Sequence, residues 1–370
     1  MSTRTAAKPI TFVLPDLGGG GAQKVILSVA EGLDRARFAP RILIVGGSQT
    51  FAARLPTDLP VEIGQAKRLR DGLPWLIRRI RATDPVVCVS VMGYLNLALL
   101  ASRLAMPART RLIVREANAI GATTRALPGW VPGRMLYRTL YPRADAIISP
   151  TTLIADEIAA LAPRAASRLA VIVNPVDVMK LRGSATPPRR RPGAGLRLVS
   201  AGRLTPQKGY DCLLDLMPTL PVDAHLTIFG EGEKRTELEA RARELRVSDR
   251  VEFPGFSTDV SAWIAGADGF LLPSRWEGLP NVVLESLALG TPAVVSDQAG
   301  ATELAAAAPA GAIMIRPVDT SFASAIRALT IVGHATFPRP SLLPIEYEQA
   351  ASISRWSELI EKIAGSGPPD

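Results

Sequence analysis

Two glutamates separated by seven residues form the most informative pattern in this sequence. Glu277 and Glu285 lie in the stretch SRWEGLPNVVLESLALGTP, in which Pro280 suits the start of a helix and Gly290 its end. The pattern predicts Glu277 in a loop and Glu285 in the second turn of the following helix. Carboxylates at these positions can accept hydrogen bonds from sugar hydroxyls, while the helix N-terminus offers N–H donors to a phosphate. The alternative, one capping and one surface glutamate, is disfavoured by this spacing.

Two basic residues in GRLTPQKGY could bind the phosphates of such a ligand. Arg203 and Lys208 follow the strand-like LRLVSA, and ligands of open α/β sheets bind beyond the carboxyl ends of the strands. Both side chains are suited to clamping a diphosphate. Either one alone could be an ordinary solvated cation, but the pair at this position favours a binding role.

Glycine-rich loops and one turn extend the candidate site. Gly20 and Gly21 in DLGGGGAQK join a predicted strand to a helix N-terminus, which favours negative charge, although a tight turn would use the same glycines. Gly230 ends the strand-like LTIFG. Phe253 begins the turn FPGF, which could form an apolar slot for a base, and a turn with core phenylalanines is the alternative.

Short apolar runs rich in Val, Ile and Leu alternate with helix-like segments along the chain. Their continuous hydrophobicity predicts parallel strands covered by helices on both faces. We expect Rossmann-like domains at residues 1–181 and 196–344, a Pro-, Gly- and Arg-rich linker at 182–195, and a last amphipathic helix at 345–365. The predicted strands are at residues 10–14, 42–45, 86–91, 112–114, 146–149, 169–173, 196–201, 226–229, 251–253, 269–272, 293–296 and 312–315.

The composition argues against several classes of site. The 370 residues contain two cysteines and two histidines, too few and too far apart for a disulfide framework, a zinc site or a histidine-based triad. There is no Asp-x-Asp motif to hold a metal-bridged diphosphate, so neither a metal nor another cofactor is expected. No apolar run approaches the roughly 20 residues of a membrane-spanning helix, and the start MSTRTAAKPI lacks the features of a secretory signal. A cytoplasmic protein is expected.

Positive charge is concentrated in the first half of the chain. The net charge is +9, and residues 1–180 contain 24 Lys and Arg against 12 Asp and Glu. An anionic partner is therefore expected, although a solvated basic surface would have the same composition. Nucleic acid is not expected, because no recognised module is present. Two segments that mix basic and aromatic residues favour an anionic membrane surface. They contain Arg68, Arg70, Trp75, Arg78, Arg79 and Arg81, and Trp130, Arg134, Tyr137, Arg138, Tyr141 and Arg143.

Through these motifs nearly the whole chain resembles the retaining glycosyltransferases of family 4. The resemblance implies the GT-B fold, with two Rossmann-like domains, a cleft between them and a C-terminal helix that crosses back to the first domain. It implies catalytic roles for Glu277, at the transferred sugar, and for Arg203 and Lys208, at the donor diphosphate. With the loops above, the expected donor-binding residues are Gly20, Gly21, Gly230, Phe253, Gly278, Leu279 and Glu285.

The stretches GGGGAQK, REAN and EGLPNVVLES look most similar to those of bacterial transferases that add N-acetylhexosamines to polyprenyl-diphosphate-linked glycans. Many relatives have a histidine near the sugar, in the loop after the fourth strand. This sequence has Arg115-Glu116-Ala117-Asn118 there. Glu116 and Asn118 are therefore the expected acceptor or sugar contacts.

The resemblance implies transfer of a hexose or N-acetylhexosamine from a nucleotide sugar, with UDP as the expected nucleotide. The acceptor would be a glycan or a polyprenyl-diphosphate-linked glycan at the inner face of the cytoplasmic membrane, in cell-surface polysaccharide or oligosaccharide synthesis. Closure of the domains about the linker would exclude water. Two alternatives stay open: a sugar-nucleotide epimerase, which would need acid/base residues beside the sugar, and a non-catalytic sugar-nucleotide-binding scaffold.

Overall fold

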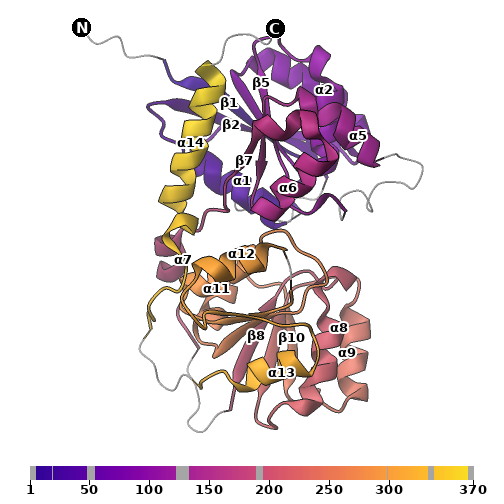
Figure 1. The fold of residues 1–370 in the computed structure, drawn as a ribbon, viewed down its shortest axis with the longest axis vertical. Coiled ribbons are helices and arrows are strands. Elements are labelled where there is room, and N and C mark those ends of the chain that lie inside the picture. The colour runs from indigo at the N-terminus through magenta and orange to yellow at the C-terminus, as the bar shows by residue number, and fades with distance from the viewer. Residues whose placement is uncertain are drawn as a thin grey trace. The chain divides into compact units, whose positions relative to one another are not determined.

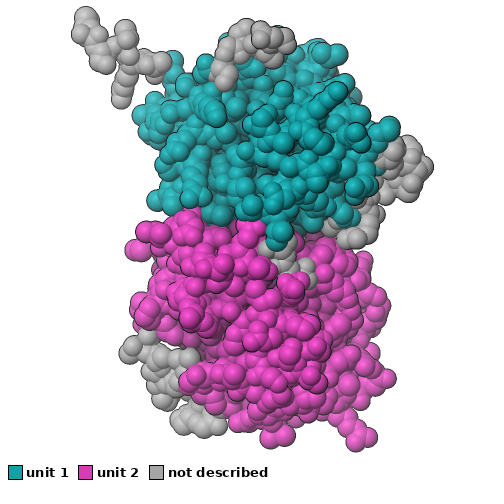
Figure 2. Space-filling model, viewed as in Figure 1, with its two compact units in different colours: residues 1–175, 349–370 teal, residues 176–348 magenta. Residues whose placement is uncertain are grey.

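The chain folds into two α/β units, shown as a ribbon in Figure 1. The computed structural model describes residues 6–18, 20–47, 55–121, 133–188, 195–297, 299–331 and 337–365. Unit 1 comprises residues 1–175 and 349–370, and unit 2 comprises residues 176–348; Figure 2 colours them teal and magenta.

Unit 1 is built on a seven-stranded sheet in the order β3-β2-β1-β4-β5-β6-β7, in which neighbouring strands are parallel. The order reverses between β1 and β4, so the loops after these two strands open at the edge where α/β sheets bind ligands. The strands are β1 (Lys8–Leu14), β2 (Phe38–Gly46), β3 (Val61–Ala66), β4 (Val87–Val91), β5 (Arg111–Arg115), β6 (Ala146–Ser149) and β7 (Leu169–Val171).

Helices cover both faces of this sheet. The unit contains α1 (Gly21–Gly32), α2 (Leu69–Thr83), α3 (Gly93–Ala101), α5 (Gly133–Leu140), α6 (Thr152–Leu161) and α14 (Gln349–Gly365). Because successive side chains of a strand point to opposite faces, Phe12 of β1 packs with α1 and α14, while Val13 packs with α2, α3, α5 and α6.

The last helix confirms the expected return of the chain to the first domain. Trp356 and Ile360 of α14 are fully buried in the core of unit 1. A Cβ on Gly32 of α1 would lie 2.9 Å from the Ile353 side chain, so the two helices pack closely beside each other (Figure 1). Ser352 Oγ also donates a 2.7 Å hydrogen bond to the Val173 carbonyl.

Unit 2 repeats the architecture on a six-stranded sheet in the order β10-β9-β8-β11-β12-β13, again parallel. Its strand order reverses between β8 and β11. The strands are β8 (Arg197–Ala201), β9 (His225–Phe229), β10 (Val251–Gly255), β11 (Gly269–Leu272), β12 (Ala293–Val295) and β13 (Ile313–Ile315). The helices are α7 (Val178–Gly183), α8 (Tyr210–Leu216), α9 (Arg235–Glu244), α10 (Val260–Ala265), α11 (Asn281–Ala288), α12 (Ala299–Ala307) and α13 (Thr320–Arg327).

The chain changes units at Pro175/Val176 and at Glu348/Gln349, whereas the sequence pattern placed the linker at residues 182–195. Arg182 lies in helix α7 of unit 2, where its guanidinium donates to the Arg339 carbonyl. The Pro188 carbonyl, also in this stretch, accepts a 3.1 Å hydrogen bond from Arg197 Nη1 of the same unit. Residues 185–188 have irregular backbone, and such backbone can still pack against its own domain. Within the described ranges, no helix is both long and apolar enough to span a bilayer.

Candidate active site

The loop between β11 and α11 places the two predicted glutamates. Pro280 occupies the position just before the helix, with φ −77°, and Asn281 is the first helical residue. Glu277 therefore lies in the loop and Glu285 in the second turn, both half-buried. Gly290 follows the helix with φ +78°, a left-handed conformation that glycine adopts readily. The local structure predicted for this motif is confirmed.

Lys208 and Glu277 contact each other directly. Lys208 Nζ lies 2.6 Å from Glu277 Oε1, and the two side chains are only 14% and 10% exposed. Ser274 Oγ donates a further 2.9 Å hydrogen bond to the same carboxylate oxygen. An ammonium has three donors, so Lys208 can hold Glu277 and still donate to a ligand oxygen. The sequence predicted separate contacts for these residues and did not identify Ser274, whose only signal is its position at the end of a predicted strand.

Arg203 and Lys208 lie at opposite ends of the loop that follows β8. The structure leaves the Arg203 side chain exposed, while Lys208 is turned toward the loop after β11. The backbone of the loop is held by the Leu204 N–H, which donates to the Glu231 carbonyl at 2.9 Å. Of the two predicted diphosphate ligands, Lys208 is the one that contacts a predicted carboxylate, that of Glu277.

Glycines allow the loops after β8, β9 and β11 to pack backbone against backbone. Gly230 has φ +137°, and a Cβ there would lie 1.9 Å from the Gly202 carbonyl oxygen. Gly209 has φ +65°, and a Cβ there would lie 2.2 Å from the Pro273 carbonyl oxygen. Both positions exclude any larger residue. The packing alone accounts for Gly230, so its expected donor contact stays a prediction.

The other predicted donor residues are positioned by neighbouring elements. Gly278 and Leu279 are buried, and a Cβ on Gly300 of α12 would lie 2.1 Å from the Gly278 carbonyl oxygen. Phe253 is half-buried and packs against the core of unit 2, which favours its interpretation as a core residue. Phe256 in the same turn is 50% exposed.

The loop after β1 begins α1 as predicted. Gly20 immediately precedes the helix and Gly21 is its first residue. Asp16 Oδ1 accepts hydrogen bonds from the Gly18 N–H at 2.7 Å and from Gln23 Nε2 at 3.2 Å, which fixes the shape of the loop. The sequence pattern did not predict this role of Asp16 and Gln23.

Glu116 is not accessible to a substrate, which corrects the expected contact. Its carboxylate is 1% exposed and accepts hydrogen bonds from Asn96 Nδ2 at 3.1 Å, from the Tyr137 hydroxyl at 3.3 Å and from the Tyr141 hydroxyl. Burial raises the pKa of Glu116 to about 8. Asn96 of α3 and Tyr137 of α5 enclose the Glu116 carboxylate, so this side chain points into the protein. Asn118, two residues on, is half-buried.

The buried carboxyl predicts a pH dependence of stability. Between an unfolded pKa of about 4.3 and the folded value of about 8, the folded chain holds one more proton at Glu116 than the unfolded chain. The contribution of Glu116 to the free energy of unfolding is therefore complete below the unfolded pKa. It is lost as the pH rises through the folded pKa, by up to about 1.4 kcal/mol per pH unit. We expect Glu116→Gln to flatten that slope in urea unfolding at several pH values. Replacing the exposed Glu252 with Gln should leave the slope unchanged, and an equal slope in all three proteins would contradict the assignment.

Among the described residues, no three His, Cys, Asp or Glu side chains come together in a group that could hold a metal ion.

The buried Arg115, beside Glu116, donates from Nη2 to Asn174 Oδ1 at 2.5 Å. This bond ties the end of β5 to the residue just before Pro175, where the chain leaves unit 1.

Two family descriptions match the chain. Residues 19–180 match glycosyltransferase family 4, and residues 188–331 match glycosyl transferases group 1. The lipopolysaccharide core biosynthesis glycosyltransferase LpsE of Rhizobium meliloti is 27% identical over 273 residues, which are 69% of this chain and 77% of LpsE.

A Campylobacter jejuni enzyme is 28% identical over 175 residues, 46% of this chain and 47% of its own length. Its name is N-acetylgalactosamine-N,N'-diacetylbacillosaminyl-diphospho-undecaprenol 4-alpha-N-acetylgalactosaminyltransferase. The crystal structure of HepE from Anabaena in complex with UDP-glucose superposes with a TM-score of 0.71 at 19% identity, over 96% of this chain and 98% of HepE. At that identity the likeness shows the fold alone.

The two parallel-sheet units and this likeness define a protein of the GT-B class, as expected from the sequence. The chain belongs to the glycosyltransferase group 1 and family 4 proteins, and it is a glycosyltransferase enzyme.

Proposed function

We propose that this enzyme transfers a hexose or N-acetylhexosamine from a nucleotide sugar to a glycan or polyprenyl-diphosphate-linked glycan, with retention of anomeric configuration. The proposal rests above all on the 2.6 Å contact of Lys208 Nζ with Glu277 Oε1. This contact joins a cation suited to a phosphate with a carboxylate suited to sugar hydroxyls, at the carboxyl ends of strands where α/β sheets bind ligands.

The substrate classes follow from the relatives. UDP-glucose bound in HepE favours a uridine nucleotide, and the undecaprenyl diphosphate in the name of the Campylobacter enzyme favours a lipid-linked acceptor. The role of LpsE in lipopolysaccharide core synthesis favours a place in cell-surface polysaccharide synthesis.

In the proposed reaction, the bond between the anomeric carbon and the diphosphate oxygen breaks while the acceptor oxygen forms the new bond on the same face. The acceptor proton passes to the departing diphosphate oxygen. Negative charge grows on that oxygen as the bond opens, and Lys208 and Arg203 stabilise it electrostatically. Glu277 and Glu285 hold sugar and ribose hydroxyls, so that the reacting atoms are already aligned. Because two cations supply the charge, we propose that the reaction needs no metal ion.

In the decisive experiment the purified protein is incubated with UDP- and GDP-sugars. Binding is measured first, from the shift in melting temperature, and turnover second, by product analysis. We expect a UDP-sugar to raise the melting temperature and to release UDP when an acceptor is added. An isomerised sugar nucleotide formed from donor alone would instead identify an epimerase. Binding without any turnover over a panel of glycan and prenyl-diphosphate acceptors would favour the scaffold and contradict the proposal.

We also propose that unit 1 binds an anionic surface at the inner face of the cytoplasmic membrane. Helix α2 supports this, because Arg68 just before it and Arg70, Arg78 and Arg81 within it are exposed. Trp75 is half-buried against Gly64, so charge rather than aromatic insertion would dominate.

The second predicted segment gives weaker support. Tyr137 and Tyr141 are buried and bonded to Glu116, so they cannot insert into a membrane, which corrects that part of the prediction. Trp130 lies outside the described residues. The exposed side chains that remain are those of Arg134, Arg138 and Arg143.

Vesicle flotation tests this proposal. Each surface cation contributes about 1 kcal/mol at low salt, so binding to vesicles rich in anionic lipid should weaken steeply as salt rises. Replacing Arg70 and Arg78 with Glu should abolish it. Salt-insensitive binding, or none, would contradict the proposal.

A further inference from the structure

The loops that carry Lys208 and Glu277 are joined residue by residue. The Arg275 N–H donates to the Gln207 carbonyl at 2.7 Å, and Gln207 Nε2 donates to the Trp276 carbonyl at 2.9 Å. One residue further along both loops, Lys208 meets Glu277 at 2.6 Å. The distance between the two functional side chains is therefore set by the bonds that precede them.

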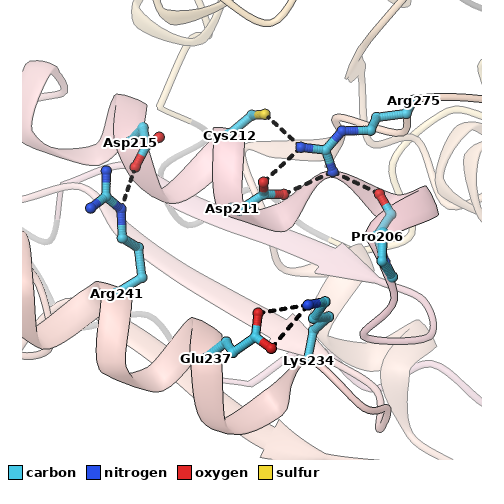
Figure 3. A network of polar contacts seen from close by, with 8 residues as sticks. All are labelled: Pro206, Asp211, Cys212, Asp215, Lys234, Glu237, Arg241 and Arg275. Carbon is cyan, nitrogen blue, oxygen red and sulfur yellow. Dashed lines mark hydrogen bonds and ion pairs between the residues drawn. The ribbon is translucent and has the colours of Figure 1, made fainter.

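The Arg275 side chain makes further contacts between its own loop, helix α8 and the turn at Pro206. Its guanidinium makes a bidentate ion pair with Asp211 of α8, Nη1 to Oδ1 at 3.0 Å and Nη2 to Oδ2 at 2.6 Å. Nη1 also donates to the Pro206 carbonyl at 2.7 Å, and Nη2 lies 3.3 Å from Cys212 Sγ. Figure 3 shows the guanidinium between the helix and the Pro206 turn. Hydrogen bonding from Arg275 lowers the pKa of the Asp211 carboxyl, so the pair stays ionised at neutral pH.

The contacts of Arg275 are expected to contribute little to the overall stability of the protein. The side chains of Arg275 and Asp211 are 38% and 54% exposed, and ion pairs of that kind contribute about 1 kcal/mol or less. The planar fork of arginine instead matches a carboxylate and a carbonyl in a fixed geometry, which a lysine would not reproduce.

We propose that Arg275, held by Asp211, is a positioning residue that sets the Lys208–Glu277 geometry and thereby the alignment of the donor's diphosphate with its sugar. The alignment part of this inference rests on the proposed function. The geometric part does not, because it concerns the protein without ligand. Lys208 stays close to Glu277 only while Arg275 holds the two loops together.

The test compares Arg275→Ala with Arg241→Ala. Arg241 makes the same kind of surface ion pair, to Asp215 of the same helix at 2.8 Å, but touches neither loop (Figure 3). The first readout is the rate at which acetic anhydride labels Lys208, measured by peptide mass spectrometry. Lys234, paired with the exposed Glu237, is the internal reference in every sample.

We expect Lys208 to be labelled more slowly than Lys234 in the wild type and several-fold faster after Arg275→Ala, with no change after Arg241→Ala. Equal labelling of Lys208 in the two variants would overturn the proposal. Circular dichroism and melting temperature are the controls for the folding of both variants.

The second readout is steady-state kinetics with the donor that the wild type uses. Misplacement of reacting groups by about 1 Å can reduce a rate roughly 100-fold, so Arg275→Ala should lower kcat by about 10- to 100-fold with a smaller effect on KM. In a Glu277→Ala background the same substitution should change kcat little, because the group that it positions is gone. Additive losses in this cycle would contradict action through Glu277. A wild type without transferase activity but with the expected labelling would overturn the proposed function and leave the geometric inference standing.

Discussion

Replacing Lys208 with alanine is expected to lower kcat/KM for the nucleotide sugar by about 100- to 1000-fold. That range is typical when one preorganised donor to a developing negative charge is removed. In the proposed reaction the charge grows on the diphosphate as the glycosidic bond opens, so most of the loss should fall on kcat. The variant also leaves the Glu277 carboxylate, 10% exposed, without the cation that contacts it. Steady-state kinetics with donor and acceptor both varied measures the effect.

Two matched variants make this prediction specific. Lys208→Arg keeps the positive charge but not the compact ammonium that contacts Glu277 and should recover only part of the rate. Lys234→Ala removes a lysine that also pairs with a glutamate in unit 2, and it should leave the rate within about twofold of the wild type, as is usual for surface substitutions. If Lys208→Ala behaved like Lys234→Ala, the assignment of the diphosphate site would be wrong.

Replacing Glu277 with alanine is expected to separate sugar transfer from nucleotide binding. Turnover should fall by about 100-fold or more, because the carboxylate proposed to hold the sugar hydroxyls is lost. UDP alone, which lacks the transferred sugar, should bind at least as tightly as to the wild type. Without Glu277, the Lys208 ammonium, 2.6 Å from that carboxylate in the structure, can donate to the diphosphate alone. Calorimetry measures the affinity for UDP, and steady-state kinetics with the sugar nucleotide measures the turnover.

A large loss of turnover without a loss of UDP affinity is the signature of this arrangement. Glu285→Ala provides the contrast, because the loss of a residue proposed to bind the ribose should weaken the binding of UDP and of UDP-sugar together. Unchanged turnover in Glu277→Ala, or a parallel loss of UDP affinity, would refute the role of Glu277 at the sugar.

The regular elements were largely predictable because their signals are local. Runs such as residues 10–14 and 269–272 are almost entirely apolar because both faces of a parallel strand are covered, and each became a strand. Among the strands that the structure describes, β3 at Val61–Ala66 was missed; it lies at the edge of its sheet and is partly exposed, so it lacks an apolar run. Proline and glycine likewise fixed the start and end of α11, because both act through their own backbone.

The sequence by itself determined the fold class, the family and the loops that carry the candidate residues, since each depends on residues near one another in the chain. Only the tertiary structure decided which of those side chains meet. The Lys208–Glu277 contact joins residues 69 positions apart, and it depends on glycine backbones packing between loops. Glu116 has the chemistry of a substrate contact, yet helices α3 and α5 and two tyrosines enclose it. Burial and long-range pairing are properties of packed elements, so no local pattern encodes them.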